Sequence, residues 1–172
     1  NYEPGTVSVV DVSRAQVIET VPCGEGPDGV ALLPDGSMGI VANFIDDSIT
    51  AFSTGSSGFL KTVSVPDGPA RVAVRPDGGE IYVTCYHAGV VVVIGTEDFI
   101  PSTTIKVNKN PVGVAFTPDG KRVYVCNQGA NTVSVIDTET HEVLMEIATG
   151  WRPTGIAITP DGSKALVTDQ GS

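Results

Sequence analysis

Short apolar runs alternate with polar turns along the whole chain, and no run has the three-to-four-residue spacing of a sustained helix. One stretch shows the pattern: 114–116 is apolar, Pro-Asp-Gly follows, and 122–127 reads Arg-Val-Tyr-Val-Cys-Asn. Residues 132–137 then alternate and are rich in β-branched side chains, and 143–147 form a fourth apolar segment. The pattern predicts four short antiparallel strands per unit and excludes a helical solenoid.

The four-strand pattern repeats along the chain. Pro-Asp-Gly begins at residues 34, 76, 118 and 160, so each step is 42 residues. Columns of proline, alanine and valine keep the same register, the valines being Val41, Val83, Val125 and Val167. Four strands in a repeat of this length are typical of one blade of a β-propeller. We therefore predict an all-β propeller of four 42-residue, four-stranded blades.

The two chain ends fall at complementary phases of the repeat. Residues 6–11 match the third strand at 132–137, and residues 164–169 match the second strand at 122–127. We expect one propeller domain over residues 1–172, closed by pairing of the N-terminal strands (about 6–21) with the C-terminal strands (about 155–169). Pairing within one chain gives a closed four-bladed ring. End exchange in a homodimer gives an eight-bladed ring, and a fragment of a larger propeller is the third alternative.

Two tetrapeptides, Tyr82-Val83-Thr84-Cys85 and Tyr124-Val125-Cys126-Asn127, have degenerate copies at 40–43 and 166–169. They resemble the YVTN family of β-propeller repeats found in surface-layer proteins. The resemblance implies a secreted, cell-surface or periplasmic adhesion or scaffold module. Related propellers include lyases, lactonases and electron-transfer subunits, and the family's propellers usually have more than four blades.

Charge and cysteine content narrow the function classes. The chain carries 10 Lys+Arg against 20 Asp+Glu, a formal net charge of −10, which disfavours binding to nucleic acid or anionic membranes. The longest aliphatic run, 90–94, is too short to cross a bilayer. Cys23, Cys85 and Cys126 show no CxxC spacing, so we expect mostly buried thiols, with one disulfide and a free thiol as the alternative. We expect no cofactor and no metal.

Two patterns that suggest chemistry have simpler explanations. Gly24-Glu25-Gly26-Pro27-Asp28-Gly29 fits the GxGxxG dinucleotide motif, but it falls in a recurring strand connection and no helix follows it. The aspartates of the four Pro-Asp-Gly turns recur in every unit. Repetition favours a turn, in which the aspartate bonds its own backbone and the glycine takes a positive φ, over a catalytic carboxylate.

A binding site needs residues that break the repeat. Arg71 stands where other units have glycine, and Trp151-Arg152 replaces small or polar residues. We expect these breaks on the face shared by the connections from second to third strand and from fourth to first. Two arginines near aromatic rings suit a small anionic or carbohydrate-like ligand, and the sole tryptophan suits a protein partner. The predicted binding residues are Phe44, Asp46, Asp47, Arg71, Tyr86, His87, Trp151 and Arg152.

The resulting prediction is a non-catalytic ligand- or protein-binding scaffold that acts through loops on one face. The alternative is a lyase or lactonase-type enzyme in which His87 and a nearby carboxylate act as the acid–base pair. A metal set of Cys85, His87 and Asp46 or Asp47 is a weaker alternative. The other histidine, His141, falls in a turn on the opposite face.

Overall fold

The computed structural model describes residues 5–55 and 58–171, and within them it contains strands and no helix. None of these residues therefore forms a helix that could span a membrane. The strands are β1 (Thr6–Asp11), β2 (Gln16–Pro22), β3 (Pro27–Leu32), β4 (Met38–Asn43), β5 (Ser48–Ser53), β6 (Gly58–Ser64), β7 (Pro69–Val74), β8 (Glu80–Cys85), β9 (Val90–Gly95), β10 (Pro101–Lys106), β11 (Pro111–Phe116), β12 (Arg122–Asn127), β13 (Thr132–Asp137), β14 (Val143–Ala148), β15 (Trp151–Ile158) and β16 (Ala165–Gly171).

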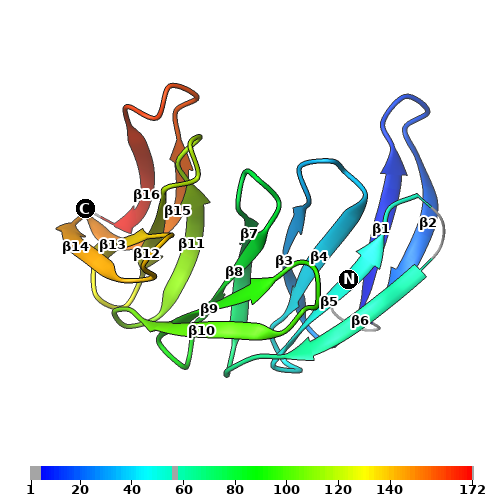
Figure 1. The fold of residues 1–172 in the computed structure, drawn as a ribbon, viewed down its shortest axis with the longest axis horizontal. Coiled ribbons are helices and arrows are strands. Elements are labelled where there is room, and N and C mark those ends of the chain that lie inside the picture. Colours follow the sequence, from blue (N-terminus) through cyan, green and yellow to red (C-terminus); the bar gives the residue numbers. More distant parts are fainter. Residues whose placement is uncertain (1–4, 56–57, 172) are drawn as a thin grey trace.

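The strands form antiparallel meanders that correspond to the predicted blades. Three sheets have four strands each, in the orders β3-β4-β5-β6, β7-β8-β9-β10 and β11-β12-β13-β14. The first strands of neighbouring blades, β3, β7, β11 and β15, contact one another in sequence along the inside of an arc (Figure 1). The structure confirms the all-β propeller prediction and the strand order within each blade.

The core lies between neighbouring blades, because each complete four-stranded sheet is covered on both faces. In these blades the second and third strands are the most buried: Ile81 and Val83 on β8 have no exposed surface, and Val92 on β9 is 1% exposed. Side chains on one face of β8 pack against the preceding blade, while Tyr82 packs on Val123 and Val125 of the next blade. Burial on both faces explains why these strands are apolar nearly throughout instead of alternating.

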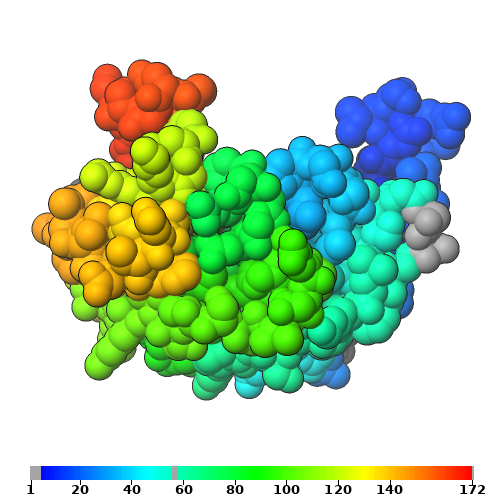
Figure 2. Space-filling model, in the orientation of Figure 1, coloured from blue at the N-terminus to red at the C-terminus, as the bar shows by residue number. Residues whose placement is uncertain are grey.

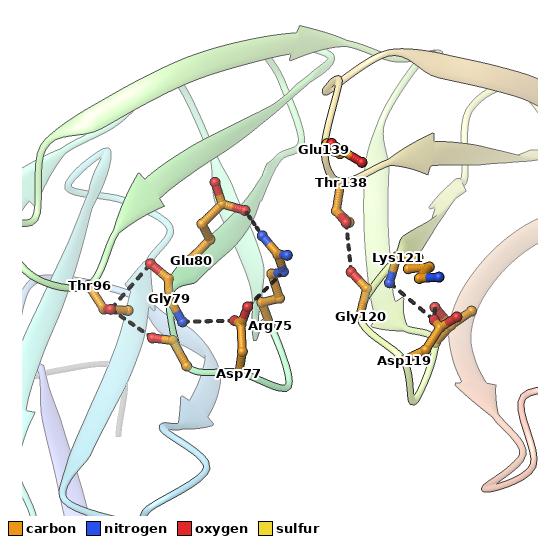
Figure 3. A network of polar contacts seen from close by, with 12 residues as sticks. Arg75, Asp77, Gly79, Glu80, Thr96, Asp119, Gly120, Lys121, Thr138 and Glu139 are labelled. Carbon is orange, nitrogen blue, oxygen red and sulfur yellow. Dashed lines mark hydrogen bonds and ion pairs between the residues drawn. The ribbon is translucent and has the colours of Figure 1, made fainter.

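The Pro-Asp-Gly segments are turns, as predicted. The Asp77 carboxylate accepts the Gly79 N–H at 3.0 Å, and Gly78 has φ +80°. Threonines directly after the third strands β9 and β13 attach these turns to the blade: the Thr96 hydroxyl donates to the Gly78 carbonyl at 2.7 Å, and the Thr138 hydroxyl donates to the Gly120 carbonyl at 2.6 Å (Figure 3). The aspartates therefore stabilise tight loops.

The chain ends form two separate two-stranded sheets, β1-β2 and β15-β16. They lie at opposite ends of the arc, where they project as two distinct lobes (Figures 1 and 2). The β1-β2 pair packs on the β3–β6 blade through Val21, Val41 and Phe52. Pairing of the two end segments with each other stays a prediction.

The remaining motifs behave largely as predicted. The GxGxxG segment connects β2 to β3 without a helix. All three cysteines are free; Cys85 and Cys126 are buried and Cys23 is half-buried, so the disulfide alternative gains no support. Burial raises the pKa of the Cys85 and Cys126 thiols to about 12.

Candidate functional site

The connection from second to third strand and the connection that precedes the first strand lie on one face of the arc, as predicted, because a backbone hydrogen bond joins them in every complete blade. In each case the first residue after the second strand donates its N–H to the connection that precedes the first strand. The three bonds are Phe44 to Gly26 at 2.8 Å, Tyr86 to Gly68 at 2.7 Å and Gln128 to Asn110 at 2.9 Å. The repeated backbone therefore places the side chains that follow the second strands in a row along one rim of the arc.

Three of the predicted binding residues form an aromatic cluster across two blades. Phe44 follows β4, whereas Tyr86 and His87 follow β8. The Phe44 ring centre lies 5.4 Å from that of His87 and 6.2 Å from that of Tyr86. Tyr86 and His87 pack edge to face at 5.1 Å, a geometry favoured by the ring quadrupoles.

Gln128 links this cluster to Arg152 in the next part of the arc. Its side-chain oxygen Oε1 accepts the Tyr86 hydroxyl at 3.0 Å and Arg152 Nη2 at 3.4 Å. We call Phe44, Tyr86, His87, Gln128 and Arg152 the loop strip. Arg152 has φ +56° and its N–H donates to Asn131 Oδ1 at 2.8 Å. Asn110, one repeat earlier, has nearly the same φ of +55°, so this backbone conformation belongs to the repeat.

Asp46 and Asp47 hold loop backbone in place. Asp47 Oδ1 accepts the Gly68 N–H at 2.8 Å, and Asp46 Oδ2 accepts the Glu25 N–H at 2.6 Å. Two repeats later, Asn131 Oδ1 makes the equivalent bond when it accepts the Arg152 N–H. The bond made by Asp47 is therefore part of the repeated architecture.

Arg71 and Trp151 lie apart from the loop strip. Arg71 Nη1 forms an ion pair with Asp28 Oδ1 at 2.6 Å in the neighbouring blade and also donates to the Ala70 carbonyl at 3.0 Å. Trp151 is 60% exposed and covers the backbone of Gly171, where a Cβ atom would lie 2.5 Å from the indole. Arg71 and Arg152 thus have different partners in different blades, Asp28 for Arg71 and Gln128 for Arg152.

Sequence reasoning missed Gln128 and Asp28. Gln128 occupies the same repeat position as Phe44 and Tyr86, and this column was the available signal. Asp28 stands where other units have Ala70, Val112 and Thr154, so it also breaks the repeat. Both were overlooked because a glutamine and an aspartate in loops look like ordinary solvated residues.

The His87–carboxylate pair of the enzyme alternative is not formed: among residues 5–55 and 58–171, no ion pair joins His87 to an acid. Over the same residues, no group of three or more His, Cys, Asp or Glu side chains has the arrangement of a metal site. The Cys85 thiol is fully buried beside the Val83 carbonyl, whereas His87 is exposed.

The opposite face carries a charged cavity of about 580 Å³ between two blades, which the sequence analysis did not predict. On one side Arg75 pairs with Asp77 and Glu80, each at 3.2 Å (Figure 3). His141 Nε2 lies 3.3 Å from Glu80 Oε1. On the other side are Lys121 and Glu139 (Figure 3). Positive and negative groups line it together, and much of the lining belongs to the repeated turns.

Comparison with solved structures places the chain among propellers. Hydrazine synthase of Kuenenia stuttgartiensis matches with a TM-score of 0.82 and 30% identity, covering 86% of this chain and 43% of that one. The Swd1 β-propeller domain of Myceliophteria thermophila matches at 0.83 and 14% identity, covering 97% and 57%. A Bacteroides uniformis protein provisionally assigned as a 6-phosphogluconolactonase matches at 0.82 and 21% identity, covering 99% and 59%.

The fold is that of a β-propeller. The chain spans 43–59% of these structures, about half of a longer propeller. A scan against protein-family models found no match, and a search of curated proteins found none either. The resemblance to surface-layer repeats therefore rests on the tetrapeptide motifs alone.

Proposed function

We propose that this propeller is a non-catalytic binding scaffold that recognises a protein partner through the loop strip. The observation that carries the proposal is a continuous series of contacts that runs from Phe44 through Tyr86 and Gln128 to Arg152. His87 packs against the rings of both Phe44 and Tyr86. The members of the series come from successive blades, so a rigid backbone presents them at fixed spacing.

The composition and shape of the loop strip favour a protein over a small molecule. Tyrosine and arginine are among the side chains most enriched in residues that dominate protein interfaces. His87 and Arg152 are exposed on a rim, whereas small-molecule sites are concave and enclose most of their ligand. Because the tetrapeptide motifs resemble surface-layer repeats, the proposal also includes a location outside the cytoplasm.

The test uses a displayed random-peptide library as the probe. Clones selected on the wild-type protein are measured against Tyr86→Ala and Arg152→Asn. The asparagine keeps the repeated backbone conformation seen at Asn110 and removes only the guanidinium. We expect each substitution to weaken binding at least about tenfold, the size of an interface hot spot.

The matched control is Phe59→Ala, because Phe59 is 53% exposed on the outer strand β6 and pairs with Phe52, near the end of β5 that lies away from the loop carrying Phe44. This variant should bind the same clones as the wild type. Equal binding by wild type, Tyr86→Ala and Arg152→Asn would overturn the proposal. Oligogalacturonate, as an acidic carbohydrate probe, tests the small-ligand alternative in the same assay. Turnover of a lactone panel that disappears in His87→Ala would favour the enzyme alternative.

A further inference from the structure

We propose that the charged cavity between the β7–β10 and β11–β14 blades binds a small organic cation through its primary ammonium group. The cavity has a volume of about 580 Å³ and lies on the face opposite the loop strip. Both blades that form it have all four strands. The inference concerns a second site and goes beyond the proposed binding function.

Four positions of the repeat are polar at this junction between blades and apolar at the junction before it. At the earlier junction they pack in one core cluster, as Leu33, Met38 and Ile40 of the β3–β6 blade and Phe99 of the next blade. One 42-residue step later all four are polar, namely Arg75, Glu80, Tyr82 and His141. The repeat is therefore broken at a whole group of residues that meet in space.

The backbone at the two junctions is the same, so the difference lies in the side chains. Phe99 and His141 have φ values of +57° and +58° in equivalent turns. The Phe99 N–H donates to the Gly95 carbonyl at 3.1 Å, and the His141 N–H donates to the Asp137 carbonyl at 2.9 Å. Polar and charged groups cost stability where apolar side chains could pack, and such departures from a pattern are expected at functional sites.

Glu80 is the centre of the polar group and keeps one oxygen atom free for a ligand. Its Oε2 accepts Arg75 Nη1 at 3.2 Å, and Arg75 Nε pairs with Asp77 Oδ2 at 3.2 Å (Figure 3). Two carboxylates thus neutralise the guanidinium. Glu80 Oε1 lies 3.3 Å from His141 Nε2, but His141 Nε2 forms no hydrogen bond with any residue that the structure describes.

The Tyr82 hydroxyl is a second polar group without a partner. Tyr82 has no exposed surface, and its hydroxyl makes no hydrogen bond within residues 5–55 and 58–171. Its ring centre lies 6.1 Å from that of His141. Burial raises the pKa of Tyr82, and the charges of Glu80, Arg75 and Asp137 also act on the hydroxyl. All three of these residues line the cavity, so the hydroxyl lies at its inner wall.

The charge of the lining selects a cation over an anion. Carboxylates outnumber permanent cations by four to two: Glu80, Asp119, Asp137 and Glu139 against Arg75 and Lys121. This excess raises the local concentration of cations and disfavours a free anion. An ammonium group has three N–H donors, and Glu80 Oε1 and the Tyr82 hydroxyl can accept two of them. A metal ion fits less well, because the described part of the chain has no group of three ligands suited to one.

The test uses n-butylammonium chloride as the probe, in phosphate buffer, with amide resonances followed by two-dimensional NMR. We expect saturable shifts at residues 80–82 and 138–141, with a Kd on the order of 1 mM for so small a ligand. Neutral n-butanol has the same alkyl chain and should give no saturable shift at these residues. Absence of saturation with n-butylammonium would overturn the proposal. Equal shifts from potassium chloride would overturn it too, because they would indicate a general effect of salt.

Two variants test the polar group itself. Tyr82→Phe keeps the ring and removes only the hydroxyl, so n-butylammonium should bind about three- to tenfold more weakly. The second variant carries the residues of the earlier junction at all four positions: Arg75→Leu, Glu80→Met, Tyr82→Ile and His141→Phe. It should have a thermal midpoint at least as high as the wild type and no saturable binding. Unchanged affinity in Tyr82→Phe, or in the folded fourfold variant, would contradict the assigned site.

A pair of charge-matched variants separates a local site from the overall negative charge of the chain. Glu97 and Glu139 hold the same repeat position in exposed turns, and only Glu139 lines the cavity. Glu139→Gln should weaken n-butylammonium binding about two- to fivefold, as for an exposed ion pair. Glu97→Gln should bind as the wild type does. Equal losses in the two variants would overturn the proposal, since binding would then follow the net charge.

Discussion

A complete blade and an end pair contain the same strands in the same sequence pattern, yet they bury them differently. Ile136 on β13 has no exposed surface, while Val10 at the same repeat position on β1 is 51% exposed. The difference comes from the strand that lies beside each one, because β13 lies between β12 and β14 and β1 pairs only with β2 among the described strands. A repeat sequence therefore determines the strand, and its neighbours determine what that strand contributes to stability.

The largest expected effect separates these two environments directly. Ile136→Ala removes a fully buried side chain and should cost about 2–5 kcal/mol of unfolding free energy, including the cavity it leaves. Val10→Ala, at a side chain that is half exposed, should cost less than about 0.5 kcal/mol, as for most surface changes. Urea unfolding followed by circular dichroism measures both. Similar losses in the two variants would contradict the comparison.

The sequence predicted the blade well because the blade is local. Strand length, turn chemistry and the 42-residue register all follow from nearby residues, and the Asp77 turn forms as expected. It predicted the candidate site only in part. Two of the predicted residues from different blades, Phe44 and His87, do meet, but Arg71 turns to Asp28 in the preceding blade.

Contacts between blades depend on how closely the first strands approach, and a single repeat unit does not contain that information. A Cβ atom on Gly29 would lie 2.7 Å from the Ala70 carbonyl oxygen of the next blade, so glycine is needed there for packing. Arg71 occupies the equivalent position in its own blade with its side chain directed away from that contact. Gln128 joins Tyr86 to Arg152 for a similar reason: the link spans blades, and no local pattern marks it.

The thiols provide a smaller test of the same contrast. Burial raises the pKa of Cys85 and Cys126 in the complete blades from 9.0 to about 12, which lowers their thiolate population about a thousandfold at a given pH. Cys23, beside the end pair, is half-buried and free. Timed alkylation with mass spectrometry should show Cys23 modified first and the other two protected until unfolding. Rapid labelling of all three would contradict the burial of β8 and β12.

The smallest effect concerns a feature that complete blades and end pairs share. Hydrogen bonds from the Thr159 hydroxyl and from Ser163 lower the pKa of Asp161, in the turn between β15 and β16, from 3.8 to about 2. The pKa of Asp119, in the corresponding turn of a complete blade, is also lowered. Each folded-state pKa lies below the unfolded one, so each carboxylate stabilises the fold above the unfolded value, and this contribution is lost as the pH falls from about 4 toward 2.

Asp161→Asn and Asp119→Asn should each reduce the fall in thermal midpoint on acidification, by similar small amounts. The turn bonds lie within one hairpin and do not need a neighbouring blade, in contrast to the burial of Ile136 and Val10. Thermal unfolding of the wild type and both variants at about pH 5 and about pH 2 measures the difference, with the midpoints compared within each variant. An effect present for Asp119 and absent for Asp161 would show that even these turns depend on completion of the blade.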